Sequence, residues 1–583
     1  MAFRRYNLEV VRIQWSADLP DESRKVLNSP LVWDFTPGQS DVEIAAKLKN
    51  VGNKAFLENR ATDAIRFYNL ALEYFPEEEI TPSGMSLLSD ILSNKAAAMI
   101  KLECFNSALA CTDKILVVDS SHVKAIYRHA KALLGLGRYA ECQFLNEKLA
   151  QIPSLGQAHE DLVRMRSSIT DLGKPPGKDI IAALRRPGPS CKAQPDLPVG
   201  MLDRISEYRG PLRLGPSNIG KGEGLFATED LAVGTVLIVC KPFAGLYVQG
   251  EEKEEFSINT NCYKYLVGTM ANKIWLDPQL GREIYTLWAG PELKSLEDDD
   301  PKIEKVDMAR LEKIYFFNVT NTGFAGQCAD HFISAGIWIP QSKIIHSCVD
   351  ANVMIGVHES SLVMMGTTFK EVKQGEEIVS SYVPPMLPFW ERDFMESHGF
   401  ICKCRLCELD RSEGAYVITK RESLLKRLKF HPLKYAIRNS ESRLIPNMKT
   451  IYVDLGILTE LKSLRAATPD LNFAMTNPEI YKMATFFLDT GSYDSCFLIL
   501  EEAYAAIRNV PPNNVKYAYA EAILVAGMKM RKEKAVLEKW VEEVRKYCRL
   551  YAGTLEHVRA GHYPTIPEDL KKFGIEFFNE ETG

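Results

Sequence analysis

Three cysteines lie within six residues of one another, in the segment Cys402-Lys-Cys404-Arg-Leu-Cys407, whereas most of the chain's 13 cysteines are scattered singly. Zinc in proteins is bound by four donors in a tetrahedron, and thiolates are among its preferred ligands. This spacing therefore supplies three of the four ligands. The alternative is three buried thiols that bind nothing, because buried cysteines are individually common. Their close spacing favours a zinc site.

Two other segments have residue types suited to binding or chemistry. The first is the glycine-rich stretch Gly220-Lys-Gly-Glu-Gly224, and the second is Gly375-Glu-Glu-Ile-Val-Ser-Ser-Tyr382. Glycines allow a ligand to approach the backbone closely, although a glycine cluster alone is a weak signal. The hydroxyl of Tyr382 has the chemistry to orient a reacting group. Without the motif that precedes it, Tyr382 would be an ordinary strand tyrosine.

Four motifs, taken in order, resemble those of a SET domain. The glycine-rich stretch at 220–224 resembles the opening of that domain, and Ile345-His-Ser-Cys348 resembles the family's Asn-His-Ser-Cys. Residues 375–382 resemble its Gly-Glu-Glu-Ile…Tyr motif, and Gly399-Phe-Ile-Cys-Lys-Cys-Arg-Leu-Cys407 resembles its cysteine-rich tail. The chain is similar to the SET-and-MYND lysine methyltransferases and to the TPR-plus-SET chains allied to them.

This resemblance implies methylation of protein lysines with S-adenosylmethionine as the cofactor. It implies that the cofactor is bound by Lys221, Gly222, Glu223, Gly224, His346, Tyr382 and Phe400. It also implies a zinc ion held by Cys348, Cys402, Cys404 and Cys407. Tyr382 is the expected catalytic residue, since its hydroxyl would orient the lysine amine in line with the methyl–sulfur bond. Positioning and electrostatics should dominate such a transfer.

The chain departs from the family pattern at several positions. Ile345 replaces an asparagine that contacts the cofactor, the segment 349–352 is one residue longer, and Cys240 replaces an acidic residue. Loss of the asparagine amide costs about 1–3 kcal/mol of binding. The MYND finger is absent, because Cys262 is the only cysteine between residues 242 and 315 and cannot form a zinc finger alone. The alternative hypothesis is therefore a catalytically impaired SET scaffold that acts as a TPR adaptor or co-chaperone.

Residues 42–155 have helical periodicity with a repeat typical of three tetratricopeptide (TPR) units. Small residues such as Gly52 and Ala64 allow two antiparallel helices to approach closely, and Tyr68 is expected to fill the gap between them. Three repeats are about the minimum that buries a continuous core. The sequence therefore predicts three helical hairpins in this region.

Five polar residues in these repeats resemble the clamp with which chaperone-binding TPR domains hold a C-terminal Glu-Glu-Val-Asp tail. They are Lys49, Asn53, Asn94, Lys124 and Arg128. Charged residues on helix faces are usually solvated. Several donors converging in one groove are, however, what a ligand with two carboxylates requires. We expect this domain to bind the acidic C-terminal tail of a cytosolic heat-shock chaperone of the seventy- or ninety-kilodalton class.

The elements that must position these residues give an α+β chain in five parts. We predict an N-terminal segment (1–41), a TPR domain (42–155), a linker rich in proline and glycine (156–204), a SET and post-SET domain (205–410) and a C-terminal helical, TPR-like domain (411–583). The SET range carries a helical insertion at about 251–313 and short apolar runs typical of strands, such as 235–239.

Composition limits the remaining possibilities. The net charge of -5 argues against direct binding of nucleic acid. No signal peptide or membrane span is expected, so we predict a cytoplasmic and/or nuclear protein whose cysteines stay reduced. The acidic run at 297–300 is expected to be a solvated loop. The expected substrate is a lysine side chain of another protein, and a small-molecule acceptor has no support in the sequence.

Overall fold

The structure is a computed structural model of the chain. It describes residues 40–75, 82–149, 175–185, 207–219, 222–249, 261–293, 303–321, 332–358, 360–383, 389–392, 401–428, 436–438 and 444–578, with the single residues 197, 201, 205, 296 and 387. The predicted acidic loop at 297–300 lies outside this set. The described residues form two compact units, one within 1–170 plus 272–280 and the other within 171–271 plus 281–583.

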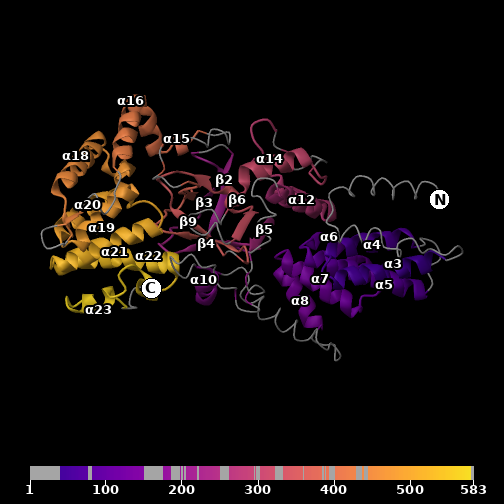
Figure 1. Ribbon diagram of the computed structural model, residues 1–583. Helices are drawn as coiled ribbons and strands as arrows, with labels where there is room; N and C mark the ends of the chain where they lie inside the picture. Colours follow the sequence, from indigo (N-terminus) through magenta and orange to yellow (C-terminus); the bar gives the residue numbers. More distant parts are fainter. Residues whose placement is uncertain are drawn as a thin grey trace. The chain divides into compact units, whose positions relative to one another are not determined.

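The first unit consists of consecutive helical hairpins, drawn in indigo to purple in Figure 1. Its helices are α3 (Asp41–Leu57), α4 (Ala61–Glu73), α5 (Pro82–Lys101), α6 (Phe105–Val118), α7 (Val123–Gly135) and α8 (Tyr139–Leu149). Each odd-numbered helix packs against the next even-numbered one. A Cβ atom on Gly52 would lie 2.6 Å from the Tyr68 ring, so the glycine allows the tyrosine to fill the space between α3 and α4, as the repeat pattern predicts.

This unit also includes the end of a helix from much later in the chain. Helix α12 (Asn261–Leu276) is followed by the 3-10 turn η3 (Pro278–Leu280). Leu276 is buried in the hairpin core. The buried Asp277 accepts a hydrogen bond from the Asn106 backbone N–H (2.9 Å) and thereby caps the N-terminus of α6. Residues 272–280 fall in the predicted SET range, but their contacts place them with the hairpins.

The second unit begins with small sheets. Their strands are β1 (Tyr208–Arg209), β2 (Leu212–Pro216), β3 (Glu223–Ala227), β4 (Val236–Cys240), β5 (Ala244–Gln249), β6 (Thr320–Asn321), β7 (Phe332–Ile337), β8 (Ile345–His346), β9 (Val353–Val357), β10 (Met364–Thr368) and β11 (Val379–Ser380). They form the sheets β1-β4-β10-β9, β5-β7-β6, β2-β3 and β11-β8. Strand β4, predicted at 235–239, is buried along its whole length because its side chains pack into two separate apolar clusters. The β8–β11 pair is parallel.

Helices interrupt and flank these strands. The predicted insertion contains α12, α13 (Gly281–Ile284) and α14 (Met308–Asn318), and a further 3-10 turn, η4, covers Gln341–Lys343. Within the predicted linker, the structure differs from expectation, because residues 178–184 form helix α10 (Lys178–Leu184). Its Ile180 and Leu184 are buried against Tyr208 and Val236 of the sheet. Burial of these apolar side chains outweighs the helix-breaking residues on either side.

The rest of the second unit is mainly helical and is coloured orange to yellow in Figure 1. It contains α15 (Phe389–Arg392), α16 (Arg405–Arg427), the strands β12 (Ala436–Arg438) and β13 (Leu444–Pro446), α18 (Met448–Leu464), η6 (Pro469–Leu471), η7 (Phe473–Thr476), α19 (Pro478–Asp489), α20 (Tyr493–Ile507), α21 (Asn514–Lys529), α22 (Lys534–Tyr547), the π-helix η8 (Cys548–Ala552), η9 (Leu555–Ala560) and α23 (Ile566–Lys571). Helices α19 to α22 pack in succession. Gly491, at φ +85°, makes the turn between α19 and α20, so these two helices form a hairpin within the predicted C-terminal helical domain.

The predicted mixed α+β class is confirmed at this level: helical hairpins, small irregular sheets and a second group of helices. Among the residues that the structure describes, no helix is both long and apolar enough to cross a membrane. The largest apolar core of the second unit runs from the cysteine-rich segment into the C-terminal helices.

Candidate functional site

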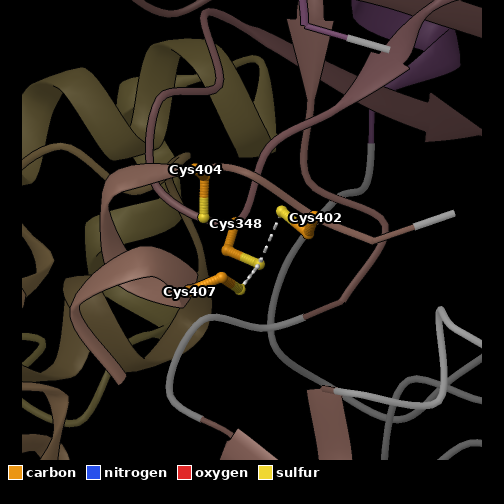
Figure 2. Close-up of side chains that lie close together, drawn as sticks. All are labelled: Cys348, Cys402, Cys404 and Cys407. Atoms are coloured by element: carbon orange, nitrogen blue, oxygen red, sulfur yellow. Dashed lines mark hydrogen bonds between the residues drawn. The ribbon is translucent and has the colours of Figure 1, made fainter. Parts of the chain in front are cut away.

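The four predicted zinc ligands converge in the structure (Figure 2). The sulfur atoms of Cys348, Cys402, Cys404 and Cys407 all lie within 4.8 Å of one another, and all four residues are buried. The Cys348 sulfur lies 3.6 Å from that of Cys407 and 4.0 Å from that of Cys402. A tetrahedral zinc site with Zn–S bonds of ~2.3 Å has sulfurs about 3.8 Å apart. The arrangement therefore fits a zinc ion held by four sulfurs.

Local structure explains how the cysteine side chains are brought together. Cys348 follows strand β8, whereas Cys404 occupies the N-cap position of α16 and Cys407 lies in its first turn. The N-terminus of a helix stabilises a thiolate through its backbone N–H groups. Hydrogen bonding to Cys348 holds the pKa of Cys404 below its ordinary value. Metal binding requires thiolates, so the helix N-terminus suits two of the proposed ligands.

His346 connects the cysteine cluster to Tyr382. Its Nε2 lies 3.2 Å from the Cys348 sulfur, and its Nδ1 accepts a hydrogen bond from the Tyr382 backbone N–H (2.9 Å). The two rings are adjacent, with centroids 5.0 Å apart. The parallel pairing of β8 with β11 produces this contact, because it aligns His346 with Ser380. Two motifs separated by more than thirty residues thus become neighbours.

Tyr382 combines an exposed ring with a constrained hydroxyl. The residue is 46% exposed, yet its hydroxyl donates a hydrogen bond to the Ile344 carbonyl oxygen. Desolvation around the hydroxyl raises the pKa of Tyr382 above its ordinary value. The phenol therefore stays neutral near pH 7, and its oxygen keeps lone pairs that can accept a hydrogen bond from a ligand.

The longer segment at 349–352 ends in a buried asparagine that supports this arrangement. Asn352 accepts a hydrogen bond from the Val379 N–H and donates one to the Glu377 carbonyl, both at 2.8 Å. These bonds fix strand β11, and so they fix the residues that lead to Tyr382. Ile345, half-buried in β8, pairs with Val379. The role of Asn352 was not identified from the sequence.

The two glycines of the predicted cofactor turn have different physical roles. Gly222 has a φ of +88°, a backbone conformation that favours glycine. Among the residues that the structure describes, none would lie within 4 Å of a Cβ atom at this position. A Cβ on Gly224 would lie 2.3 Å from the Glu377 Oε1 atom. Gly224 therefore makes room for a buried carboxylate, whereas the sequence suggested that it makes room for the cofactor.

The buried carboxylate of Glu377 contacts the residues on both sides of the turn. Glu377 is 6% exposed, and its Oε2 accepts a hydrogen bond from the Asn218 N–H (2.9 Å). Its Oε1 has no hydrogen-bond partner among the residues that the structure describes. Glu223, a predicted cofactor-binding residue, is exposed and forms an ion pair with Lys343 (3.2 Å). A buried carboxylate therefore lies against the predicted cofactor turn.

Three other sequence predictions have simple outcomes. Lys221 and Phe400, both predicted to bind the cofactor, lie outside the described residues. Cys240 is buried in β4 opposite Met364, where it packs in the sheet core. It therefore behaves as a small apolar residue at that position.

Four of the five predicted clamp residues make contacts within the first unit. Asn53 Oδ1 accepts hydrogen bonds from Tyr68 and from Asn94, both at 2.9 Å. Arg128 donates to Asn94 at 3.5 Å and also to Ser93. Lys49 forms an ion pair with Asp90 at 3.3 Å. Lys124, the fifth predicted clamp residue, is exposed on α7. Asn53, Asn94 and Arg128 thus form a hydrogen-bonded row across three helices.

Two buried charged residues beside the cysteine cluster were missed by sequence reasoning. Arg392 and Asp410 are 4% and 1% exposed, respectively, and form an ion pair with each other. Neither belongs to a motif that the sequence analysis used. An arginine ten residues before a cysteine triplet gives no signal of its own, because only the packing of α15 on α16 brings the two together.

No protein-family model matches the chain. It is 22% identical, over 428 residues, to a protein from Gibberella zeae named "Methyltransferase". That similarity covers 67% of this chain but only 55% of the Gibberella protein. The alignment with the solved structure of yeast Tom70 covers 91% of this chain and 90% of the Tom70 chain, at 10% sequence identity. The TM-score of 0.19 is too low to support a common fold.

Shorter stretches are similar to proteins of a second kind. The chain is 34% identical over 141 residues to the Hsp70/Hsp90 co-chaperone cns1 of Schizosaccharomyces pombe, covering 24% of this chain and 38% of that protein. It is 36% identical over 102 residues to serine/threonine-protein phosphatase T of Aspergillus oryzae, covering 18% of this chain and 19% of the phosphatase. Similarity to a methyltransferase and similarity to a co-chaperone therefore occur in one chain.

Proposed function

We propose that this chain is an S-adenosylmethionine-dependent protein-lysine methyltransferase of the SET type, with a structural zinc ion. The observation that carries the proposal is the convergence of the four cysteine sulfurs, with His346 in contact with both Cys348 and Tyr382. Similarity to the Gibberella methyltransferase supports the reaction class. The lysine substrate, the cofactor and the zinc ion come from the sequence motifs.

Tyr382 has the properties that orientation of an amine requires. Its own proton is donated to the Ile344 carbonyl, so the phenolic oxygen is left to accept a hydrogen bond from the substrate amine. Because its pKa is raised, the phenol stays neutral beside a cationic cofactor. S-adenosylmethionine, when bound, supplies the methyl group. Holding the amine in line with that group is where the residue contributes to the rate.

The expected cofactor site is the turn around Gly222. The buried negative charge of Glu377 suits a cationic ligand. Lys221, Glu223, Gly224 and Phe400 are proposed to complete the site on the basis of their motifs alone.

The test is calorimetric binding of S-adenosylmethionine to the full chain, followed by methylation of candidate protein substrates. We expect wild type to bind. Ile345→Asn should bind roughly five- to a hundredfold more tightly, because it restores a hydrogen bond worth about 1–3 kcal/mol. Tyr382→Phe keeps the aromatic ring but loses the hydroxyl that orients the amine, so it should still bind the cofactor and should transfer no methyl group. Failure of wild type to bind the cofactor would refute the enzymatic proposal.

Ile345 favours one second candidate, a scaffold that no longer methylates. Its side chain cannot form the polar contact made by the family asparagine. In that case wild type would fail to bind S-adenosylmethionine, and Ile345→Asn would restore binding. The same calorimetry therefore distinguishes the two candidates.

We also propose that the first unit binds the acidic C-terminal tail of a cytosolic heat-shock chaperone, in the cytoplasm or nucleus. The similarity to cns1 supports this partner class. Burial lowers the pKa of the Arg128 guanidinium, so the negative charge of a carboxylate ligand would offset the cost of burying this cation. Asn53 and Asn94 lie in the same row.

The test uses a fluorescent peptide ending in Glu-Glu-Val-Asp and the same peptide with an amidated C-terminus. We expect binding of the first peptide only. Arg128→Ala should weaken it roughly ten- to a hundredfold, the effect of losing a charge-assisted hydrogen bond. Lys49→Ala should also weaken it, whereas Lys54→Ala, on the same helix and exposed, should not. Equal binding of both peptides would refute carboxylate capture.

A further inference from the structure

Arg392 lies directly against the cysteine cluster. Its Nη1 is 3.1 Å from the Cys407 sulfur and 3.7 Å from the Cys348 sulfur. Its Nε donates to the Leu387 carbonyl at 3.0 Å, and the residue is 4% exposed. A buried guanidinium is costly unless its donors have partners. Here two of those partners are sulfur atoms of the proposed zinc ligands.

A second set of contacts fixes the orientation of this guanidinium. Its Nη2 pairs with Asp410, which is 1% exposed and is also bound by Arg421 (3.0 Å) and Arg465. Glu413 pairs with Arg421 at 3.0 Å and with Arg465 at 2.8 Å. The network therefore links the cysteine cluster, α16 and the end of α18, and every one of these pairs is largely buried.

The charges of this network do not balance. It contains three arginines and two carboxylates, which leaves one surplus positive charge next to the cysteines. Four thiolates around one Zn²⁺ carry two surplus negative charges. The surplus charge of the network, delivered through Arg392, therefore offsets part of the charge of a zinc-loaded cluster. Four neutral thiols would carry no negative charge to balance the surplus positive charge of the network.

We infer that Arg392 is a positioning residue for the metal centre: its N–H groups hold the Cys348 and Cys407 thiolates and reduce their reactivity once zinc is bound. N–H donors around metal ligands generally strengthen metal binding, and their loss costs ~10–100-fold in affinity. A thiolate that accepts a charged hydrogen bond is also a weaker nucleophile. This inference rests on the zinc part of the proposed function.

Arg421 provides a matched control. Both arginines pair with Asp410, but among the described contacts only Arg392 reaches a sulfur. Asp410 keeps two guanidinium partners when either arginine is removed, but Arg421→Met also removes a pair with Glu413. Arg421→Met therefore disturbs the ion network at least as much as Arg392→Met does. A specific effect on the metal should appear in the first variant alone.

The experiment first measures the zinc content of the purified full chain. It then follows zinc transfer to an excess of the chelator 4-(2-pyridylazo)resorcinol, and alkylation of the cysteines by iodoacetamide. We expect transfer and alkylation to be roughly 10–100 times faster in Arg392→Met. Arg421→Met should match wild type. Arg392→Lys keeps the positive charge but loses the planar guanidinium with its several N–H donors, so its rates should be intermediate.

Two results would overturn the inference. One is an Arg392→Met protein that retains zinc as well as wild type does, and the other is equal acceleration in Arg392→Met and Arg421→Met. If Arg392→Met does not fold, the comparison of Arg392→Lys with Arg421→Lys decides in the same way. A wild type without zinc would instead refute the proposed metal centre, before the variants are compared.

Discussion

Replacement of Glu521 by glutamine tests whether a buried carboxylate limits the stability of the C-terminal helices. Glu521 lies on α21 and is 0% exposed. Its Oε2 accepts a long hydrogen bond from the His562 backbone N–H (3.3 Å). The approach is tight, because a Cβ atom on Gly561 would lie 2.1 Å from Oε1 and 2.5 Å from the Tyr517 hydroxyl. Burial of the charge outweighs the two groups that favour it, the Tyr517 hydroxyl and the His562 N–H.

The size of the effect follows from the pKa. Burial raises the pKa of Glu521 from 4.5 to about 7. As the pH rises from 4.5 to 7, the unfolded chain loses this proton first, so the folded state binds more protons and stability falls. At about 1.4 kcal/mol per pKa unit, the loss above pH 7 is roughly 3 kcal/mol. Below pH 4.5 the carboxyl group is neutral in both states, and the effect is absent.

The assay is differential scanning calorimetry of the full chain between pH 5 and 8, with the C-terminal transition assigned by limited proteolysis. Wild type should lose stability across this range. Glu521→Gln should lose less, and at pH 8 it should be the more stable protein. Glu538→Gln, an exposed change on α22, should follow wild type. A variant that is less stable than wild type at pH 8 would show that the charged carboxylate is stabilising and that the reasoning is wrong.

Two further substitutions test other parts of the molecule. Asp277→Ala removes the side chain that caps the N-terminus of α6, so urea unfolding should show the first unit destabilised by about 1–2 kcal/mol. The control, Asp113→Ala on the exposed face of α6, should have little effect. Glu377→Gln keeps an acceptor for the Asn218 N–H but removes the charge beneath the cofactor turn, so calorimetry should show S-adenosylmethionine binding weakened about tenfold. Binding of S-adenosylhomocysteine, which lacks the sulfonium charge, should change less, and equal losses for both ligands would argue against this electrostatic role.

The sequence alone determined the features that depend on local periodicity and spacing. The helical hairpins of the first unit followed from small residues at repeat positions, and Gly52 does meet Tyr68 as predicted. The α+β class followed from the order of the patterns, with helical repeats first, short apolar runs typical of strands next and helices again at the end. The three clustered cysteines also indicated a metal site, because spacing within six residues restricts where their side chains can lie.

Only the tertiary structure decided the contacts between distant segments. It brought Cys348 to the other three cysteines. It also brought His346 to Tyr382 through the parallel β8–β11 pair. It also placed Arg392 against sulfur, Glu377 beneath Gly224 and Asp277 at the start of α6. Each of these charged residues looks like ordinary surface charge in the sequence. Their burial depends on what packs over them, which no local pattern encodes.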